Sequence, residues 1–450
     1  MTGAIRKLKS LTYPQIIALG YLLVIAIGTL LLALPIASRN HIPPSFISVL
    51  FTATSATCVT GLVVFDTYTQ WSVFGQLVIL LLIQVGGLGF MTIVTMFSIF
   101  LKRKIGLKER GLLRESVNTM YIGGIVRLTE KILMGTLLFE VIGAILLSYR
   151  FIPQMGLKAG LYNAVFHSVS AFCNAGFDLM GKFGMYSSLT SFSDDVVVSL
   201  TVIMLIIVGG IGFFVWDDLS KHKHQFKKYQ LHTKIVLSMT IILIVLGTVG
   251  FYISERTNLL SNMPIGEQIL VSLFSSVTPR TAGFNTIDTG ALKPSTKLLT
   301  MILMFIGGSP GSTAGGIKTV TLAVILVSLW SSVRNKKSDN IFGRRLEDNA
   351  LKRASAVMTV NMILALSAAF LISATNTALD LSDVSFEVIS AIGTVGLSTG
   401  ITDSLNTFGR IIIILLMYCG RVGSLSFALL FTEHRIPSCI QSPSEKINIG

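Results

Sequence analysis

Four short loops, each centred on a glycine, hold the residues of this chain that could do chemistry. Their glycines recur at intervals of 115, 107 and 113 residues. Glycine has no Cβ, so it tolerates backbone whose carbonyl groups turn toward a common axis. Four such loops around one axis would form rings of carbonyl oxygens, which can replace the hydration shell of a monovalent cation. This pattern predicts a cation filter made of Val59, Thr60, Gly61, Asn174, Ala175, Gly176, Thr281, Ala282, Gly283, Thr394, Val395 and Gly396.

The sequence segments on either side of these loops also occur four times. A short apolar, Ser-rich run precedes each glycine, and a second glycine follows 24 to 34 residues later inside a long apolar segment. The runs are 49–57, 164–172, 270–278 and 386–392, and the second glycines are Gly87, Gly210, Gly308 and Gly420. Each run is too brief to cross a bilayer and predicts a half-helix whose partly negative C-terminus points at the loop axis. Irregular backbone at membrane depth survives only inside protein or beside a wet cavity, so the repeating unit is typical of one quarter of a pore.

The composition indicates an integral membrane protein. The 450 residues are 52% hydrophobic and 13% charged, about half the charged fraction of a soluble protein. A crossing helix needs about 20 predominantly apolar residues. Eight segments meet this length, at 15–35, 71–101, 132–149, 196–216, 235–253, 298–330, 354–374 and 408–431. We therefore predict an all-α membrane protein of eight transmembrane helices.

The predicted helices group into four tandem repeats of spanning helix, re-entrant pore helix with filter loop, and spanning helix. The predicted repeats are 1–101, 127–232, 233–335 and 350–435, followed by a tail at 436–450. Because lysine and arginine favour cytoplasmic loops, both termini are predicted in the cytoplasm, and the filter faces outward. The basic loops, at 102–131, 217–234 and 331–353, suit contacts with anionic lipid and also a cytosolic docking partner. Nucleic acid binding is not expected, since no recognition fold surrounds these loops.

An unusual stretch interrupts the second apolar segment of repeat three. Glycine costs about 1 kcal/mol and proline about 3 kcal/mol relative to alanine inside a helix, so a run with five glycines and a proline must break it. The loop is predicted to lie against the pore below the filter. Its residues are Gly307, Gly308, Ser309, Pro310, Gly311, Ser312, Thr313, Ala314, Gly315 and Gly316. A phosphate-binding loop is excluded, because Ile317 separates Gly316 from Lys318 and both flanks are apolar helix.

Two charged residues fall inside predicted spanning helices. Arg421 follows Gly420, and the predicted register places it at the position of Leu88 in repeat one. A guanidinium at that depth is costly unless it faces a wet cavity or carbonyl groups, so Arg421 is predicted to contact the 307–316 loop, with a buried structural role as the alternative. For Glu140, in the first helix of repeat two, a structural hydrogen bond is favoured over ion coupling.

Metal binding and disulfides are not predicted from the cysteines and histidines. Cys58, Cys173, Cys419 and Cys439 lack metal-ligand spacing, and the first two occupy equivalent positions before filter glycines, where small buried residues are expected. The run Lys221-His222-Lys223-His224 is interpreted as a solvated loop rather than a metal site.

The four-fold repeat, the four filter glycines and the broken helix together resemble the Trk/Ktr/HKT superfamily of potassium transporters, most closely the membrane subunit of bacterial Ktr systems. The resemblance implies that a glycine in each loop accompanies K⁺ selectivity, with K⁺ bound at the filter carbonyls, and that a serine in the first loop accompanies Na⁺ transport. It makes the 307–316 loop an intramembrane gate, with Arg421 near the pore and Lys318 helping to hold the gate closed. It also implies a homodimer in the bacterial cell membrane and a cytosolic ring of the RCK type that binds ATP or ADP.

The leading functional hypothesis is therefore a potassium-selective, channel-like uptake subunit. Sodium dependence is left open. The chain has no dinucleotide-binding fingerprint, so no organic cofactor is expected and nucleotide sensing would belong to another chain. The alternative is a sodium-driven transporter of another small solute, a class with inverted repeats and broken helices, although two crossings in each repeat give all four the same orientation. An enzyme is not expected, because no catalytic constellation occurs at matching depth.

Overall fold

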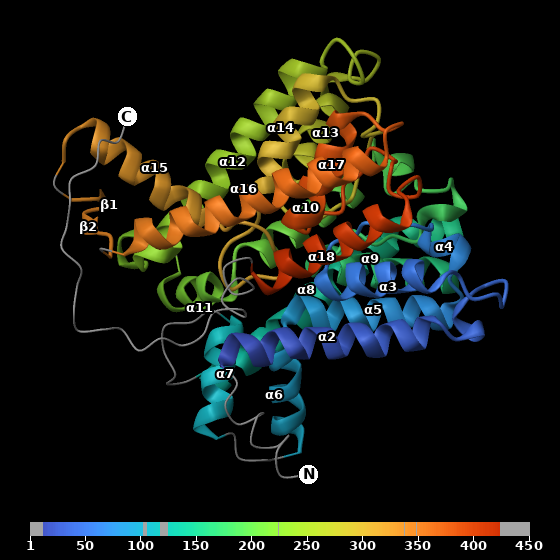
Figure 1. Ribbon diagram of the computed structural model, residues 1–450, viewed down its shortest axis with the longest axis horizontal. Coiled ribbons are helices and arrows are strands. Elements are labelled where there is room, and N and C mark those ends of the chain that lie inside the picture. The colour runs from blue at the N-terminus through green and yellow to red at the C-terminus, as the bar shows by residue number, and fades with distance from the viewer. Residues whose placement is uncertain are drawn as a thin grey trace.

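The computed structural model describes residues 12–101, 106–117, 125–223, 225–336, 338–347 and 349–423. The same succession of a long helix, a short helix ending near a loop glycine, and a further apolar helix occurs four times, and in the first three this further helix is interrupted (Figure 1). The predicted tail at 436–450, Cys439, His224 and the end of the last predicted span lie outside the described residues.

The first two successions contain the following elements. The first has α2 (Tyr13–Leu32), η1 (Pro35–Ala37), α3 (Phe46–Cys58), α4 (Thr67–Gln70), α5 (Val73–Leu88), α6 (Phe90–Phe100) and α7 (Leu107–Val117). The second has α8 (Ile125–Met155), α9 (Leu157–Phe172), η2 (Met180–Lys182), η3 (Thr190–Phe192), α10 (Val196–Gly210) and α11 (Phe213–His222).

The last two successions follow the same order. The third has η4 (Phe226–Lys228), α12 (Leu231–Glu255), α13 (Ile265–Val277), α14 (Pro294–Phe305), α15 (Thr319–Val333), and a hairpin of β1 (Asn340–Ile341) and β2 (Arg344–Arg345). The fourth has α16 (Ala350–Thr375), α17 (Leu381–Gly393) and α18 (Thr407–Val422).

The first helix of each succession is continuous, whereas the second spanning segment is interrupted in the first three successions. In the fourth, the described residues end at Gly423, just after α18. Among the described residues, α2, α8, α12 and α16 are long and apolar enough to cross a membrane, and α10 with α11 meets the same criterion only when the two helices, bent by 94° at their break, are taken together. The continuous helices predicted at 71–101 and 196–216 are therefore corrected. They break at Gly89 and Gly212, whose φ values are +85° and +95°. The break predicted in repeat three is present between α14 and α15.

The four successions pack in a closed order. Helix α5 contacts α9, α10 contacts α13, α14 contacts α17, and α18 contacts α3. These contacts join the first succession to the second, the second to the third, the third to the fourth, and the fourth back to the first. Figure 1 shows α18, at the red end of the chain, beside α3 at the blue end. The four short helices α3, α9, α13 and α17 therefore belong to one ring.

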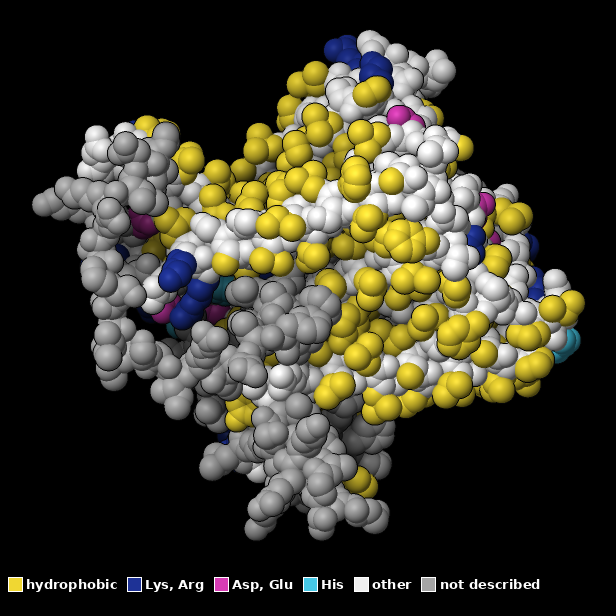
Figure 2. Space-filling view, in the orientation of Figure 1, with side chains coloured by type: hydrophobic (Ala, Val, Ile, Leu, Met, Phe, Trp, Pro, Cys, Tyr) yellow, Lys and Arg dark blue, Asp and Glu magenta, His cyan; other side chains and the backbone are white. Residues whose placement is uncertain are grey.

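The outer surface of the ring is apolar. Figure 2 shows hydrophobic side chains, in yellow, over the broad face of the molecule, and coloured charged side chains mainly toward the edges of that face. Leu30, Leu81 and Phe370 are each at least 65% exposed. Monomeric soluble proteins rarely expose contiguous apolar patches larger than a few hundred Å². The surface therefore matches a lipid-facing belt around a multi-pass membrane protein.

Candidate ion filter and the loop below it

The four loop glycines form a closed ring in the middle of the fold. A Cβ built on each glycine would lie 2.8 Å or less from a carbonyl oxygen of the next loop. The pairs are Gly61 with Ala175, Gly176 with Ala282, Gly283 with Val395, and Gly396 with Thr60. The four loops that are predicted to be a filter are thus brought together, each in contact with its neighbour, and only glycine fits at the contact.

The loops hold a strained backbone. Each glycine has positive φ, between +70° and +93°, and so does the residue two positions before it. Three of those preceding residues, Val59, Thr281 and Thr394, are β-branched, with φ of +57°, +73° and +51°. A β-branched residue with positive φ is an outlier. Such strain costs about 1–3 kcal/mol per residue and clusters at active sites and ligand clamps.

Serines near the ends of the short helices hold the loops in place. In three of the loops, the N–H of the residue before the glycine donates to a serine carbonyl at 2.8 Å. The pairs are Thr60 with Ser55, Ala175 with Ser170, and Val395 with Ser390. The hydroxyls of Ser55 and Ser390 also accept the N–H of Gly61 and Gly396 at 3.1 Å. The hydroxyl contacts therefore give Ser55 and Ser390 a structural role that periodicity alone does not reveal.

An acidic cavity opens on one side of the ring. It has a volume of about 240 Å³ and is lined by the four glycines together with Asp66, Asp178, Asp288 and Asp403. We call it the acidic vestibule. A concave surface lined by negative charge raises the local concentration of cations.

The 307–316 loop lies on the opposite side of the ring. Gly315 packs against the side chain of Thr394 in the fourth filter loop. The Thr313 hydroxyl donates to the Phe172 carbonyl at 3.2 Å, at the C-terminus of α9. A second cavity of about 580 Å³, the inner cavity, is lined by Gly311, Ala314, Lys318 and Arg421, among others. The loop therefore separates the ring from this cavity.

Arg421 and Lys318 bind the loop through its carbonyl groups. The Arg421 guanidinium donates to the Thr313 carbonyl and to the carbonyls of Gly86 and Gly87 on α5, the last at 3.1 Å. Lys318 Nζ donates to the carbonyls of Ala314 at 2.7 Å and Gly315 at 3.3 Å. The contact between Arg421 and the loop, expected from their similar depth, is present.

A family model described as "Cation transport protein" (TrkH) matches residues 10–441. The chain belongs to the TrkH family of cation transport proteins. It is therefore a transport protein rather than an enzyme.

Curated relatives match this TrkH-family chain along its length. It is 41% identical to the potassium/sodium uptake protein NtpJ of Enterococcus hirae, over 99% of both chains. It is 43% identical to the Ktr system potassium uptake protein B of Bacillus subtilis, over 98% of this chain and 97% of the relative. Its fold matches the crystal structure of the potassium transporter TrkH from Vibrio parahaemolyticus with a TM-score of 0.69 and 17% identity, over 92% of this chain and 84% of the other.

The glycines in the second helices of the TrkH-family repeats correspond to one another in an alignment that differs by one residue from the predicted alignment. A Cβ on Gly86, Gly209 or Gly420 would collide with the last carbonyl groups of the preceding short helix, at Thr57, Phe172 and Ile392 respectively. Gly86 and Gly209, rather than Gly87 and Gly210, are therefore the counterparts of Gly420. Arg421 corresponds to Gly87 and not to Leu88. The register is set by how closely each interrupted helix approaches the carbonyl end of its own short helix.

The interruption itself involves a third glycine that sequence reasoning missed. Gly89, Gly212 and Gly423 follow the closely packed glycines by three residues and have φ of +85°, +95° and +93°. The N–H of Phe213, next to Gly212, donates to the Gly311 carbonyl at 2.8 Å, and Ser309 N–H donates to Gly210 O at 3.0 Å. The break in the second repeat therefore holds the tip of the 307–316 loop. The spacing of three residues between glycines was the available signal.

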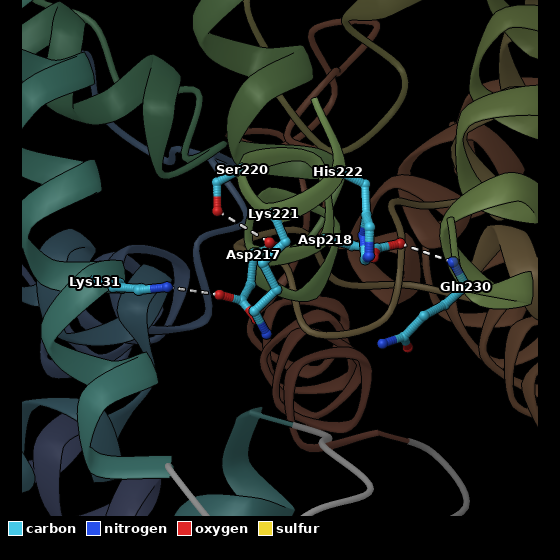
Figure 3. Close-up of polar contacts among 7 residues, drawn as sticks. All are labelled: Lys131, Asp217, Asp218, Ser220, Lys221, His222 and Gln230. Atoms are coloured by element: carbon cyan, nitrogen blue, oxygen red, sulfur yellow. Dashed lines mark hydrogen bonds and ion pairs between the residues drawn. The ribbon is translucent and has the colours of Figure 1, made fainter. Parts of the chain in front are cut away.

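Helix α11 starts at this break and is clamped at its far end (Figure 3). Asp217 accepts from Lys131 on α8 at 2.9 Å and from Lys221 at 2.5 Å. Asp218 pairs with His222 at 2.9 Å and accepts the Gln230 N–H, next to α12, at 2.9 Å. Lys221 and His222 are thus paired residues at the end of a helix rather than in a loop, while Lys221 and Lys223 remain exposed to solvent as predicted. Among the described residues no group of three or more potential ligands could hold a metal ion.

The contacts of Glu140 and of three cysteines indicate structural roles. Gln84 donates to the Glu140 carboxylate at 3.3 Å, which is the hydrogen bond that was favoured for this residue. Cys58, Cys173 and Cys419 are free and buried. A Cβ on Gly87 would collide with Cys173, so these small residues pack where two helices approach closely.

Proposed function

We propose that this chain is the potassium-selective, ion-translocating membrane subunit of a Ktr-type uptake system. The single observation that carries the proposal is the closed ring in which each of four loop glycines abuts a carbonyl oxygen of the next loop. Rings of carbonyl oxygens can replace the hydration shell of K⁺. The relatives support the choice of ion, since they are named as uptake proteins for potassium or for potassium and sodium. Sodium is therefore included as a coupled or second transported ion.

We assign the gate to the 307–316 loop. It lies between the ring and the inner cavity, so an ion that leaves the ring must pass it. Its base is closed by a bridge between Ile306 and Ile317, and its tip is held by Gly210 and Phe213 of the second repeat. Arg421 and Lys318 donate hydrogen bonds to loop carbonyls that would otherwise face the cavity unpaired, and these bonds hold the loop in the blocking position.

We assign control of this gate to a second chain. A Ktr-type subunit would act as a homodimer with one pore per subunit, with both termini cytoplasmic, against a cytosolic RCK-type ring that binds ATP or ADP. Helix α11 offers a route for this control, because its N-terminus bonds to Gly311 of the gate and its far end is clamped by Lys131 and Gln230 (Figure 3). A shift of the clamp would move α11 and the loop tip with it.

Rubidium uptake into liposomes tests this function. The purified chain is reconstituted into liposomes that contain K⁺, and radioactive rubidium is added outside. Equimolar external K⁺ is expected to suppress rubidium entry. Equimolar external Na⁺ is expected to leave most of the rubidium entry unchanged. Equal suppression by both ions, or no rubidium entry even with the gate loop deleted, would contradict a potassium filter and favour transport of another solute.

Replacing Arg421 with alanine is expected to raise rubidium uptake by about tenfold, because hydrogen bonds from a charged donor contribute about 1.5–3 kcal/mol each and here they hold the gate closed. Arg421→Lys keeps the charge but not the two-pronged contact with Thr313 and Gly86, so an intermediate rate is expected. Uptake is measured for both variants with K⁺ and Na⁺ as competitors. A loss of K⁺ preference at unchanged rate would place Arg421 in the filter instead of the gate.

The vestibule charges are expected to tune affinity rather than selectivity. Asp288→Asn combined with Asp403→Asn is expected to raise KM for rubidium by about twofold to fivefold at low ionic strength, since the carboxylates concentrate cations at the ring. The effect is expected to shrink in 0.15 M salt, where the screening length falls to about 8 Å. A KM change that is independent of ionic strength would show that the variants act through structure and not through charge.

A further inference from the structure

Two of the four short helices carry a buried, ionisable side chain nine residues before the loop glycine. They are Glu387 on α17 and His167 on α9, which are 1% and 0% exposed. The equivalent positions in the first and third repeats hold Thr52 and Phe274. An ionisable group at membrane depth is costly and points to a function by default.

Glu387 ties α17 to the segment that follows the fourth glycine. Its Oε1 accepts the hydroxyl of Thr402, six residues after Gly396. The Thr402 hydroxyl lies 3.1 Å from the Ser398 hydroxyl, which accepts the Gly400 N–H at 3.0 Å. Ser398, Gly400 and Thr402 all line the acidic vestibule. Glu387 thus holds one wall of the vestibule from behind.

His167 makes the same kind of tie in the second repeat. Its Nε2 accepts the N–H of Leu179, three residues after Gly176, at 3.3 Å. Because Nε2 accepts, the proton is on Nδ1, which lies 2.7 Å from the Asn163 carbonyl. The ring packs edge-on against Phe151 at 5.6 Å, which fixes its orientation. His167 is therefore a neutral brace between α9 and the segment after the glycine.

The other two repeats lack this brace. The Thr52 hydroxyl donates to the Ser48 carbonyl of its own helix at 3.0 Å, and Phe274 has no polar side-chain atom. The loops follow one another in the order one, two, three, four around the ring. The braced repeats, two and four, are therefore diagonal to each other.

We propose that Glu387 and His167 are positioning residues that determine ion selectivity by fixing the chain on the vestibule side of the ring at two opposite points. This inference rests on the proposed filter function. Because a carbonyl ring discriminates between ions by the placement of its oxygens, loosening one brace lowers the preference for K⁺ over Na⁺ more than it lowers the rate. The Oε2 atom of Glu387 has no hydrogen-bond partner among the described residues, so Glu387 holds the wall through Oε1, which accepts the Thr402 hydroxyl with the Ser398 hydroxyl beside it.

Variants of Glu387 and Thr402 test this, by rubidium uptake with K⁺ or Na⁺ as competitor. Glu387→Leu and Thr402→Val each remove the contact and are expected to lower the K⁺ preference by about fivefold, the effect of losing one hydrogen bond. Combining both is expected to lower it no further, because they break the same contact. Glu387→Gln keeps an acceptor oxygen and is expected to retain the parent preference.

Three comparisons keep the test decisive. Thr52→Val, at the equivalent but unbraced position, is expected to leave the preference unchanged. Equal losses in Glu387→Gln and Glu387→Leu would assign the effect to charge and overturn the brace. If Glu387→Leu does not fold, Thr402→Val alone decides, and an unchanged preference in that variant overturns the inference. A parent protein without K⁺ preference would instead refute the proposed function.

Discussion

Gly61→Ser is expected to lower the preference of uptake for K⁺ over Na⁺ by at least about tenfold, equivalent to about 1.4 kcal/mol. Gly61 has φ of +89°, and a Cβ there would lie 2.5 Å from the Ala175 carbonyl oxygen. The added side chain must displace that oxygen or flatten the loop. Either change disrupts the ring where its oxygens must match the size of a dehydrated ion. Competition of Na⁺ with rubidium uptake measures the effect.

A matched control for this variant is Gly266→Ser. Gly266 lies in the first turn of α13, and a Cβ there would meet no atom within 4 Å. The preference of the Gly266→Ser variant for K⁺ over Na⁺ is expected to equal that of the parent protein. An unchanged ratio in Gly61→Ser, with folded protein in both cases, would count against the first loop as part of the filter.

Deletion of residues 309–314 is expected to raise the rate of rubidium uptake by about tenfold or more, which is a lowering of the barrier by about 1.4 kcal/mol. The deletion removes the tip of the gate together with the Thr313 carbonyl that Arg421 binds. The ends of the gap are already close, because Ile306 pairs with Ile317 and Thr319 N–H donates to Gly308 O at 3.1 Å. The shortened chain can therefore close without pulling on α14 or α15.

The K⁺ preference of the deletion variant serves as its internal control. The ring lies on the other side of the removed residues, so the preference is expected to persist while the rate increases. A folded deletion variant that transports rubidium more slowly than the parent would contradict the gate assignment. Thr313→Val, which removes the hydroxyl that donates to Phe172, offers a milder test in the same direction.

Much of the site could be predicted because its glycines are required by the backbone. Gly61 and its three counterparts occupy positions where any Cβ would strike a carbonyl, so their recurrence was visible in the sequence. The contact between Arg421 and the 307–316 loop was predicted because an unpaired guanidinium at that depth needs carbonyl partners. Neither argument required knowledge of the tertiary structure.

The additional breaks and the register of the glycine doublets were harder to predict from the sequence. Single glycines such as Gly89 and Gly212 are common in transmembrane helices, and their apolar flanks favour a continuous helix. The doublets Gly86-Gly87 and Gly209-Gly210 allow two registers, and only the approach of the short helix decides between them. The pairing of His222 with Asp218 depends on where α11 ends, which the charged run alone does not indicate.

The position of rubidium in crystals of the purified chain tests the central claim most directly. Rubidium scatters anomalously, so anomalous difference maps distinguish it from Na⁺ and water. We expect a peak on the axis enclosed by Gly61, Gly176, Gly283 and Gly396, and we expect excess K⁺, but not equal excess Na⁺, to displace it. Bound rubidium at a site outside the ring, with an empty axis in protein that transports rubidium, would contradict the claim that these loops are the filter.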